Sequence, residues 1–259
     1  MDEFLSHVIR TLTEGVEDIE SIRLYGSQVN PQVVDMWSDY DLWIVLHSSA
    51  RIDQLRFIQT VNDIGIVVGS ELHRKDHSVL YRTAIAFESS MRLLDATVSH
   101  EEPPSANLSV WPIGMLEHLE PRSTPNMLSV TNPAPRADET RISLTWFKYM
   151  GAINKFCRHD NLIGMHLLLD LIREFLVLEM VERDNRKKTN IHRYGSHELL
   201  PEPIRLSNIY ESDPKRLLDY IAKLAYAYDQ KIVSMVEGYT SRVHWILEYI
   251  ERSQEHLLK

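Results

Sequence analysis

Two apolar segments near the start of the chain, and the residues between them, constrain its fold more than any other feature. Residues Ile19–Tyr25 have the composition of a strand that ends at Gly26, and Asp39 and Asp41 open a second, strongly apolar strand over residues 41–46. Side chains alternate along a strand, so both aspartates are predicted to project from the same face. Adjacent carboxylates repel each other unless a cation lies between them, and hard divalent ions such as Mg²⁺ take this kind of oxygen site.

The turn after the first strand and a later strand supply the other parts of a site. Gly26 lets backbone N–H groups approach a phosphate closely, and the hydroxyl of the adjacent Ser27 adds a donor there. Asp95 is the lone carboxylate of the apolar segment Met91–Val98, which is predicted to form a hairpin with Tyr81–Phe87. If that segment pairs beside the second strand, three acids from two strands form a two-metal site suited to in-line nucleotidyl transfer.

The first half of the chain alternates short strands with helices, which predicts a mixed sheet of the α/β (α+β) class. Apolar residues at helical spacing predict helices over Glu3–Glu14 and Ile52–Asn62, and a further short strand is predicted over Ile64–Val68.

The second half has long stretches of helical period, enough for an all-helical bundle. The predicted helices are Arg141–Arg158, Leu162–Arg183, Pro214–Met235 and Val236–Leu258. Between the halves, four prolines make residues 120–136 a poor helix or strand. We therefore predict a mixed-sheet domain over residues 1–130 and a helical, substrate-binding domain over residues 131–259.

Composition excludes several classes of protein. Hydrophobic residues make up 44% and charged residues 25% of the chain, as in globular proteins and unlike disordered ones. One cysteine, an acidic N-terminal segment and the lack of an apolar run of membrane-spanning length predict a cytoplasmic protein with no membrane partner. The net charge of −9 argues against a nucleic-acid binder. All the excess acid lies in residues 1–130, which hold 19 acidic and 9 basic residues, against 18 and 19 in residues 131–259.

The spacing of these motifs resembles the signature of the nucleotidyltransferase superfamily typified by DNA polymerase β. That signature is a Gly-Ser pair, an acid–apolar–acid triplet and a third acid on a nearby strand, and the match covers residues 20–100. The closer resemblance is to bacterial antibiotic nucleotidyltransferases, especially the aminoglycoside 6-adenylyltransferases that modify streptomycin, with lincosamide nucleotidyltransferases as neighbours. One departure is Gln28, where such enzymes often carry a basic residue; Arg23 is a candidate substitute.

The resemblance implies a nucleotidyltransferase, with a small catalytic domain followed by a helical one. It implies transfer of a nucleoside monophosphate, AMP from ATP or from another nucleoside triphosphate, to a hydroxyl of a small molecule, with release of pyrophosphate. Aminoglycoside or lincosamide antibiotics are the implied acceptors, which would confer antibiotic resistance, and the acidic first half suits a cationic acceptor. Asp39, Asp41 and Asp95 would hold two Mg²⁺ ions, and Gly26 and Ser27 the triphosphate. The enzyme is expected to be a monomer or a homodimer.

Three residues of the second half are further candidates for this site. In the apolar helix Leu162–Arg183, which is predicted to be buried, the polar residues form one stripe. Asp170 of this stripe is a candidate general base for the acceptor hydroxyl, with a solvated or salt-bridged face as the alternative. Lys155 and Arg158 are candidate triphosphate-binding cations, and the alternative is a helix C-terminus stabilised by cations.

Two other functions fit the same residues. In the first of these, the protein transfers a nucleoside monophosphate to a protein side chain, as in protein AMPylation, or to an RNA end. The negative net charge argues against RNA. The third function is a catalytically silent nucleotide-binding protein of the same fold. Gln28 favours it, whereas three intact acids argue against it, because a chain freed from catalysis has no reason to keep repelling carboxylates together.

Overall fold

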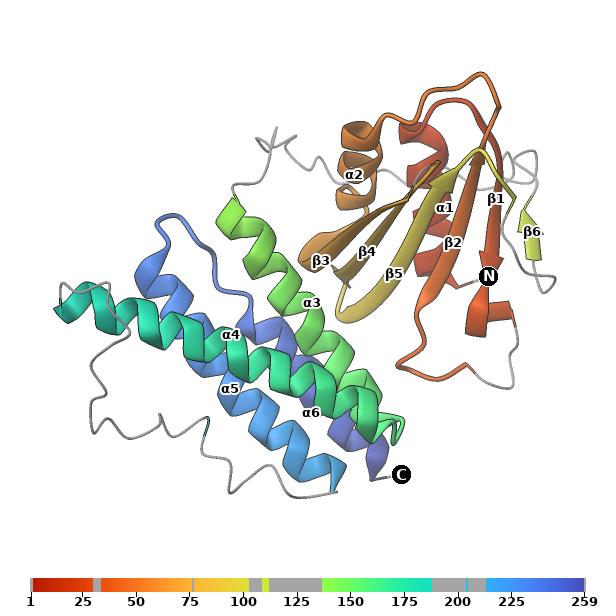
Figure 1. Cartoon of the computed structure of the whole chain (residues 1–259). Coiled ribbons are helices and arrows are strands. Elements are labelled where there is room, and N and C mark those ends of the chain that lie inside the picture. The colour runs from red at the N-terminus through yellow and green to blue at the C-terminus, as the bar shows by residue number, and fades with distance from the viewer. Residues whose placement is uncertain are drawn as a thin grey trace. The chain divides into compact units, whose positions relative to one another are not determined.

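The computed structural model describes residues 2–29, 34–75, 77–102, 109–111, 137–187, 204 and 213–258 (Figure 1). The chain divides into two compact units, Met1–Leu144 and Thr145–Lys259, and the division falls within a helix. The domain boundary predicted at residue 130, and the proline-rich segment 120–136, lie outside the described residues. That boundary therefore stays a prediction.

The first unit is built on a mixed sheet, and the protein has the α+β class predicted for it. The strands are β1 (Ile19–Tyr25), β2 (Tyr40–Leu46), β3 (Ile66–Lys75), β4 (Ser78–Phe87), β5 (Ser90–Ser99) and β6 (Ser109–Trp111). They lie in the order β3-β4-β5-β2-β1-β6. Among the described pairs, β2 and β5 run parallel and the others antiparallel. The parallel pair brings the starts of two strands distant in the sequence side by side.

Helices α1 (Glu3–Gly15) and α2 (Gln54–Asn62) cover one face of this sheet (Figure 1). Asp2 and Asp53 cap their N-termini by accepting hydrogen bonds from backbone N–H groups. Apolar residues of both helices pack on alternate residues of the central strands. Those contributed by β2 and β5 are Tyr40, Leu42, Ile44, Leu46, Leu94, Ala96 and Val98. Because side chains alternate, Asp41 and Asp95 project from the opposite face.

The structure confirms the strand over residues 19–25, the strand opened by the two aspartates, and the hairpin that carries Asp95. Strand β3 differs, since it continues to Lys75 rather than ending at Val68. Its second half, from Leu72 onward, is an exposed and mostly polar stretch of an edge strand. Such a stretch needs no apolar alternation, and the pattern therefore did not reveal it.

The regular elements described in the second unit are helices: the larger part of α3 (Ala137–Cys157), and α4 (Asn161–Lys187), α5 (Pro214–Met235) and α6 (Val243–Leu257). All four were predicted, with different bounds for α3, α4 and α6. The all-helical character of this unit stays a prediction, because residues 188–203 and 205–212 lie outside the described part. Within the described residues, no helix is both long and apolar enough to cross a membrane.

Aromatic residues of α3 form the core of the second unit, as their helical spacing predicts. Trp146, Tyr149 and Phe156 are fully buried. The segment before α6 is not helical, because Asp229 of α5, also fully buried, accepts hydrogen bonds from the Tyr239 hydroxyl and from groups of residues 241 and 242. These bonds hold residues 236–242 as a loop, which corrects the helix predicted to start at residue 236.

The prediction that α4 is buried is wrong for one of its faces. Leu162 is 85% exposed and Leu169 is 52% exposed, and His166 and Arg173 lie on the same stripe of the helix. Residues at these spacings lie on one face of a helix. Because α4 is apolar nearly all round, its composition did not reveal which face packs against other helices.

Candidate metal centre

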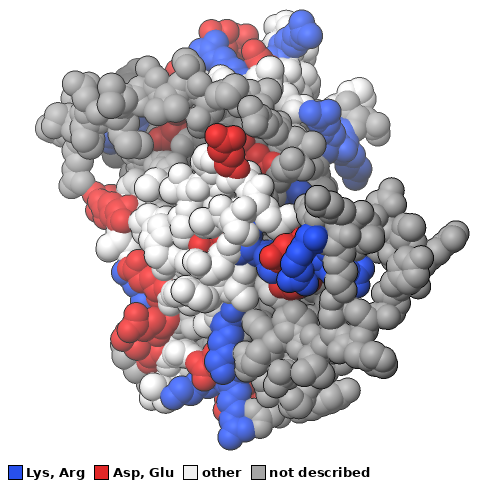
Figure 2. Space-filling view, turned by 90° about the vertical axis from the view of Figure 1, so that its left-hand side faces the viewer, with Lys and Arg blue, Asp and Glu red and all other residues white. Residues whose placement is uncertain are grey.

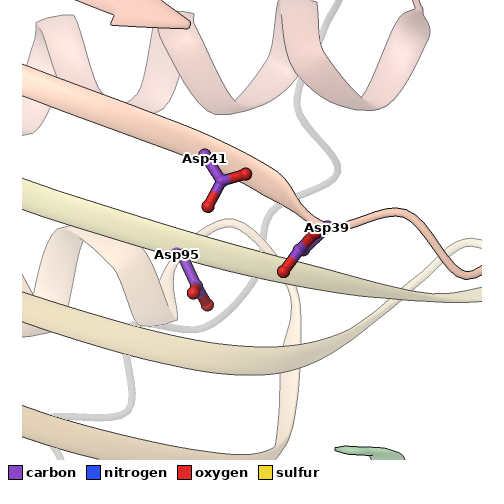
Figure 3. A group of neighbouring side chains, drawn as sticks. All are labelled: Asp39, Asp41 and Asp95. Carbon is purple, nitrogen blue, oxygen red and sulfur yellow. The ribbon is translucent and has the colours of Figure 1, made fainter. Parts of the chain in front are cut away.

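Strand pairing brings the three predicted aspartates together on one face of the sheet. In the parallel pair of β2 and β5, Asp41 lies directly opposite Asp95. Asp39 precedes β2 by one residue and points to the same side as Asp41 (Figure 3). One carboxylate oxygen from each aspartate lies within 4.8 Å of the others. The spacing is therefore small enough for a single cation to contact all three side chains.

The cluster belongs to a row of polar residues that crosses five strands at one register. Tyr25 of β1 pairs with Asp41, and on the other side Asp95 pairs with Arg82 of β4, which pairs in turn with Glu71 of β3. Side chains at one register of a sheet lie on the same face. The three acids are thus flanked by a phenol on one side and by a guanidinium–carboxylate pair on the other.

Arg82 is one residue of the candidate site that the sequence did not reveal. Its Nε donates a hydrogen bond to Oδ2 of Asp95 at 2.8 Å, and its Nη1 lies 3.4 Å from Oε2 of Glu71. His73 extends the pair, with Nε2 3.0 Å from the same Glu71 oxygen. The signal in the sequence was a lone cation in the apolar segment Ser78–Phe87, but its partner depends on the register of the hairpin.

Burial and mutual repulsion dominate the electrostatics of the cluster. Burial raises the pKa of Asp41 to about 7, helped by the charges of Asp39 and Asp95 and opposed by Arg82. Burial also raises the pKa of Asp95 despite the neighbouring guanidinium. For Arg82, burial lowers the pKa, but the charge and hydrogen bond of Asp95 outweigh it and raise the pKa. The cluster holds more negative charge than its surroundings neutralise.

A divalent cation fits this donor set. Hard cations prefer carboxylate oxygens, and a cation between the aspartates would remove the repulsion that raises the pKa of Asp41. Among the described residues, these three aspartates are the one group of at least three acids, histidines or cysteines close enough to share an ion. The predicted metal ligands thus have the chemistry and the spacing of a metal site.

Gly26 contacts the cluster in a way that the sequence did not predict. It has a φ of +69°, the left-handed conformation that favours glycine. A Cβ atom at this position would lie 2.9 Å from Cγ of Asp41 and still closer to its Oδ2. The positive φ therefore favours glycine here, and any side chain would also force the Asp41 carboxylate to move, whether or not a phosphate approaches the same backbone.

Ser27 follows in a short 3₁₀ turn, Gly26–Val29, that leads away from β1. Its Oγ is buried and has no hydrogen-bond partner among the described residues. Burying a hydroxyl without a hydrogen-bond partner costs free energy of folding. A ligand oxygen that accepts a hydrogen bond from Ser27 Oγ would remove this cost. Arg23, the candidate substitute for a cation at Gln28, is ion-paired with Glu102.

Tyr25 lies beside Asp41 and is a second residue that the sequence left out of the site. Burial, and then the charge of Asp41, raises the pKa of its hydroxyl to about 12, so the phenol is neutral at physiological pH. Its ring packs edge-on against Trp43, with centroids 6.3 Å apart. These two aromatic rings border the acid cluster along β1 and β2.

Two of the three predicted site residues of the second unit, Asp170 and Lys155, make local ion pairs. Lys148 Nζ lies 2.7 Å from Oδ2 of Asp170, which joins α3 to α4, and this hydrogen bond lowers the pKa of Asp170. A lowered pKa makes a weaker base, which counts against the general-base role expected for Asp170. Lys155 Nζ lies 3.4 Å from Oδ2 of Asp160, and Arg158 lies in the turn after α3.

No family model matches this chain, and no curated protein sequence matches it. The chemistry of the site itself is therefore the basis for inferring a function. Three clustered carboxylates beside a turn whose Ser27 hydroxyl has no partner in the described part of the chain can hold divalent cations and receive an anionic ligand at the same place.

Proposed function

We propose that this protein is a Mg²⁺-dependent nucleotidyltransferase, which transfers AMP from ATP to a hydroxyl group of a small molecule. The observation that carries the proposal is the register of β2 and β5, which places Asp41 opposite Asp95 with Asp39 beside them. Three carboxylates from two neighbouring strands are the donor set that two-metal phosphoryl transfer needs.

Each predicted site residue of the first unit has a part in this reaction. Asp39 and Asp41 would hold two Mg²⁺ ions between them, and Asp95 would share the ion on the acceptor side. When bound, the ions supply charge stabilisation for the phosphate oxygens and lower the pKa of the attacking hydroxyl. Backbone N–H groups at Gly26 and the orphaned Ser27 hydroxyl would bind the triphosphate.

The reaction balances without an oxidant or reductant. The acceptor oxygen forms a bond to the α-phosphorus of ATP, the bond from that phosphorus to the bridging oxygen breaks, and pyrophosphate leaves with the bonding electrons. The hydroxyl proton passes to a base. The aspartates that bind cations are poor proton acceptors, and Asp170 is already held by Lys148, so we assign this base to none of them.

For the acceptor we propose an aminoglycoside or a lincosamide antibiotic. Support comes from the excess of acid in residues 1–130, which would concentrate a cationic acceptor. On the face shown in Figure 2, the acidic and basic side chains are interspersed rather than gathered into one large patch of a single sign. Charge attraction is therefore expected to act locally, near the cluster.

The proposal is tested by incubating purified protein with ATP, Mg²⁺ and a panel of antibiotics. The measurements are the release of pyrophosphate and the mass of the product. The wild-type protein should add 1 AMP to an acceptor, a gain of about 329 Da fixed by the transferred group. Asp39→Asn should abolish turnover, whereas Asp63→Asn, which changes an exposed aspartate of the same unit, should not. ATP binding that is indifferent to Mg²⁺, with no turnover of any acceptor, would instead identify a silent nucleotide-binding protein.

A further inference from the structure

Arg82 occupies a position that fixes the orientation of Asp95. The two residues are directly paired across β4 and β5, and Nε of Arg82 donates to Oδ2 of Asp95 at 2.8 Å. Asp95 is only 8% exposed. This bond leaves Oδ1 as the oxygen of Asp95 that has no donor among the described residues, and thus as the oxygen available to a cation.

The guanidinium is itself held from its other side. Glu71 is the register partner of Arg82 on β3, and its Oε2 lies 3.4 Å from Nη1. One planar group therefore spans two carboxylates, one at the acid cluster and one outside it. Rotation of a carboxylate about its last side-chain bond is broad in the absence of such a partner. The Glu71–Arg82 pair restricts this rotation for Asp95.

Asp39 and Asp41 have no such support from Arg82. The guanidinium of Arg82 donates hydrogen bonds to Asp95 and to Glu71, and it acts on Asp41 through its charge. Loss of the guanidinium geometry should therefore affect Asp95 first, while Asp39 and Asp41 keep their places.

We propose that Arg82 is a positioning residue, which holds the Asp95 carboxylate in the orientation that binds a divalent cation, and that Glu71 supports it. This inference rests on the proposed function, since it concerns the same metal site. Arg82 would act on the bound cation indirectly. Its effect passes through Asp95, as in metal sites where outer partners orient the ligands.

Arg82→Lys separates geometry from charge. Lysine keeps the positive charge near the cluster, so the Coulomb interaction with a bound cation is retained. A single ammonium nitrogen does not reproduce the planar fork that spans Asp95 and Glu71. Glu71→Gln is a second variant, which leaves Arg82 in place, replaces its charged outer partner by a neutral one and changes a residue at the partly exposed end of the row.

The proposal is tested by measuring how tightly the full chain binds Mn²⁺ alone. Calorimetry gives the dissociation constant, and electron paramagnetic resonance reports the free Mn²⁺. Arg82→Lys should weaken Mn²⁺ binding about 10- to 100-fold, the range for partners that orient metal ligands. Glu71→Gln should weaken it less. Arg74→Lys, a matched control at an exposed arginine of β3, should bind Mn²⁺ as the wild type does. Melting temperatures without metal show whether each variant is folded.

Asp95→Asn supplies the reference that separates this inference from the proposed function. If Asp95→Asn weakens Mn²⁺ binding while Arg82→Lys and Glu71→Gln bind as the wild type does, Arg82 does not position Asp95 and this inference fails alone. If the wild type binds no Mn²⁺, or Asp95→Asn has no effect, the metal site of the proposed function fails and the role of Arg82 with it.

Discussion

Gly26 lies against the carboxylate of Asp41, so that the conformation of the turn after β1 depends on the acidic face of β2. The glycine has a φ of +69°, and a Cβ atom there would lie 2.9 Å from Cγ of Asp41. The residue that a sequence motif would assign to phosphate binding therefore also gives the Asp41 side chain its space.

Gly26→Ala should displace Asp41 and weaken Mn²⁺ binding by about tenfold or more, because a misplaced ligand loses much of its contribution. The matched control is Gly238→Ala, at a φ of +79° with nothing within 4 Å of the added Cβ. Both substitutions carry the backbone strain of a positive φ, on the order of 1 kcal/mol. Only Gly26→Ala should change the Mn²⁺ dissociation constant measured by calorimetry, and equal affinities would show that Asp41 has room to move.

The raised pKa of Asp41 predicts how the metal-free protein responds to pH. Its pKa is about 7 when folded and near 3.8 when unfolded, so the folded state binds the proton more tightly. Stability contributed by this group is present below pH 4 and is lost as the pH rises through 7. Asp41→Asn should remove this loss of unfolding free energy. The metal-free variant should be more stable than the wild type at pH 8, by an amount on the order of 2 kcal/mol after allowance for the partial exposure of Asp41.

Urea unfolding at pH 5 and pH 8, with a chelator present, measures this effect. The difference in unfolding free energy between Asp41→Asn and the wild type should grow with pH. A difference in unfolding free energy between Asp41→Asn and the wild type that is constant over this range would contradict the raised pKa of Asp41.

Alternation along the strands predicts that the three aspartates share one face, but their clustering also requires that the two strands are neighbours. Asp39 and Asp41 are two residues apart at the start of a strand, and Asp95 interrupts an apolar strand, so each has to project from the polar face. That β5 pairs with β2 was a condition of the prediction, and the structure confirms it.

Arg82 and Glu71 were not predicted, because their part in the site depends on cross-strand register. A shift of β4 by one residue would turn Arg82 toward α1 and α2, and no local pattern specifies that shift. Likewise, the apolar composition of α4 predicted burial without showing that the Leu162 stripe is exposed. Local periodicity identifies elements and faces, whereas the partners of a face are set by tertiary packing.

Metal binding should stabilise the wild-type protein at neutral pH. A ligand that binds only the folded state stabilises it by about 2.7 kcal/mol at 100 times its dissociation constant. Saturating Mg²⁺ or Mn²⁺ should therefore raise the melting temperature of the first unit, and a chelator should reverse the rise. Asp39→Asn should lose most of this response. Ca²⁺, a larger ion with longer bonds to oxygen, serves to show whether the site selects by size.

The ion pair between Asp170 and Lys148 predicts a structural role for Asp170. Its pKa is lowered by the hydrogen bond from Lys148, so its contribution to stability is present at neutral pH and is lost as the pH falls through the lowered value. Asp170→Asn should cost at most about 1 kcal/mol, since the pair is partly exposed. It should reduce turnover less than tenfold, whereas loss of a general base typically costs about 10²- to 10⁴-fold. A larger fall in kcat at unchanged melting temperature would show that Asp170 is the general base. In that case Lys148→Met, which removes the ion pair but keeps Asp170, should leave kcat near the wild-type value.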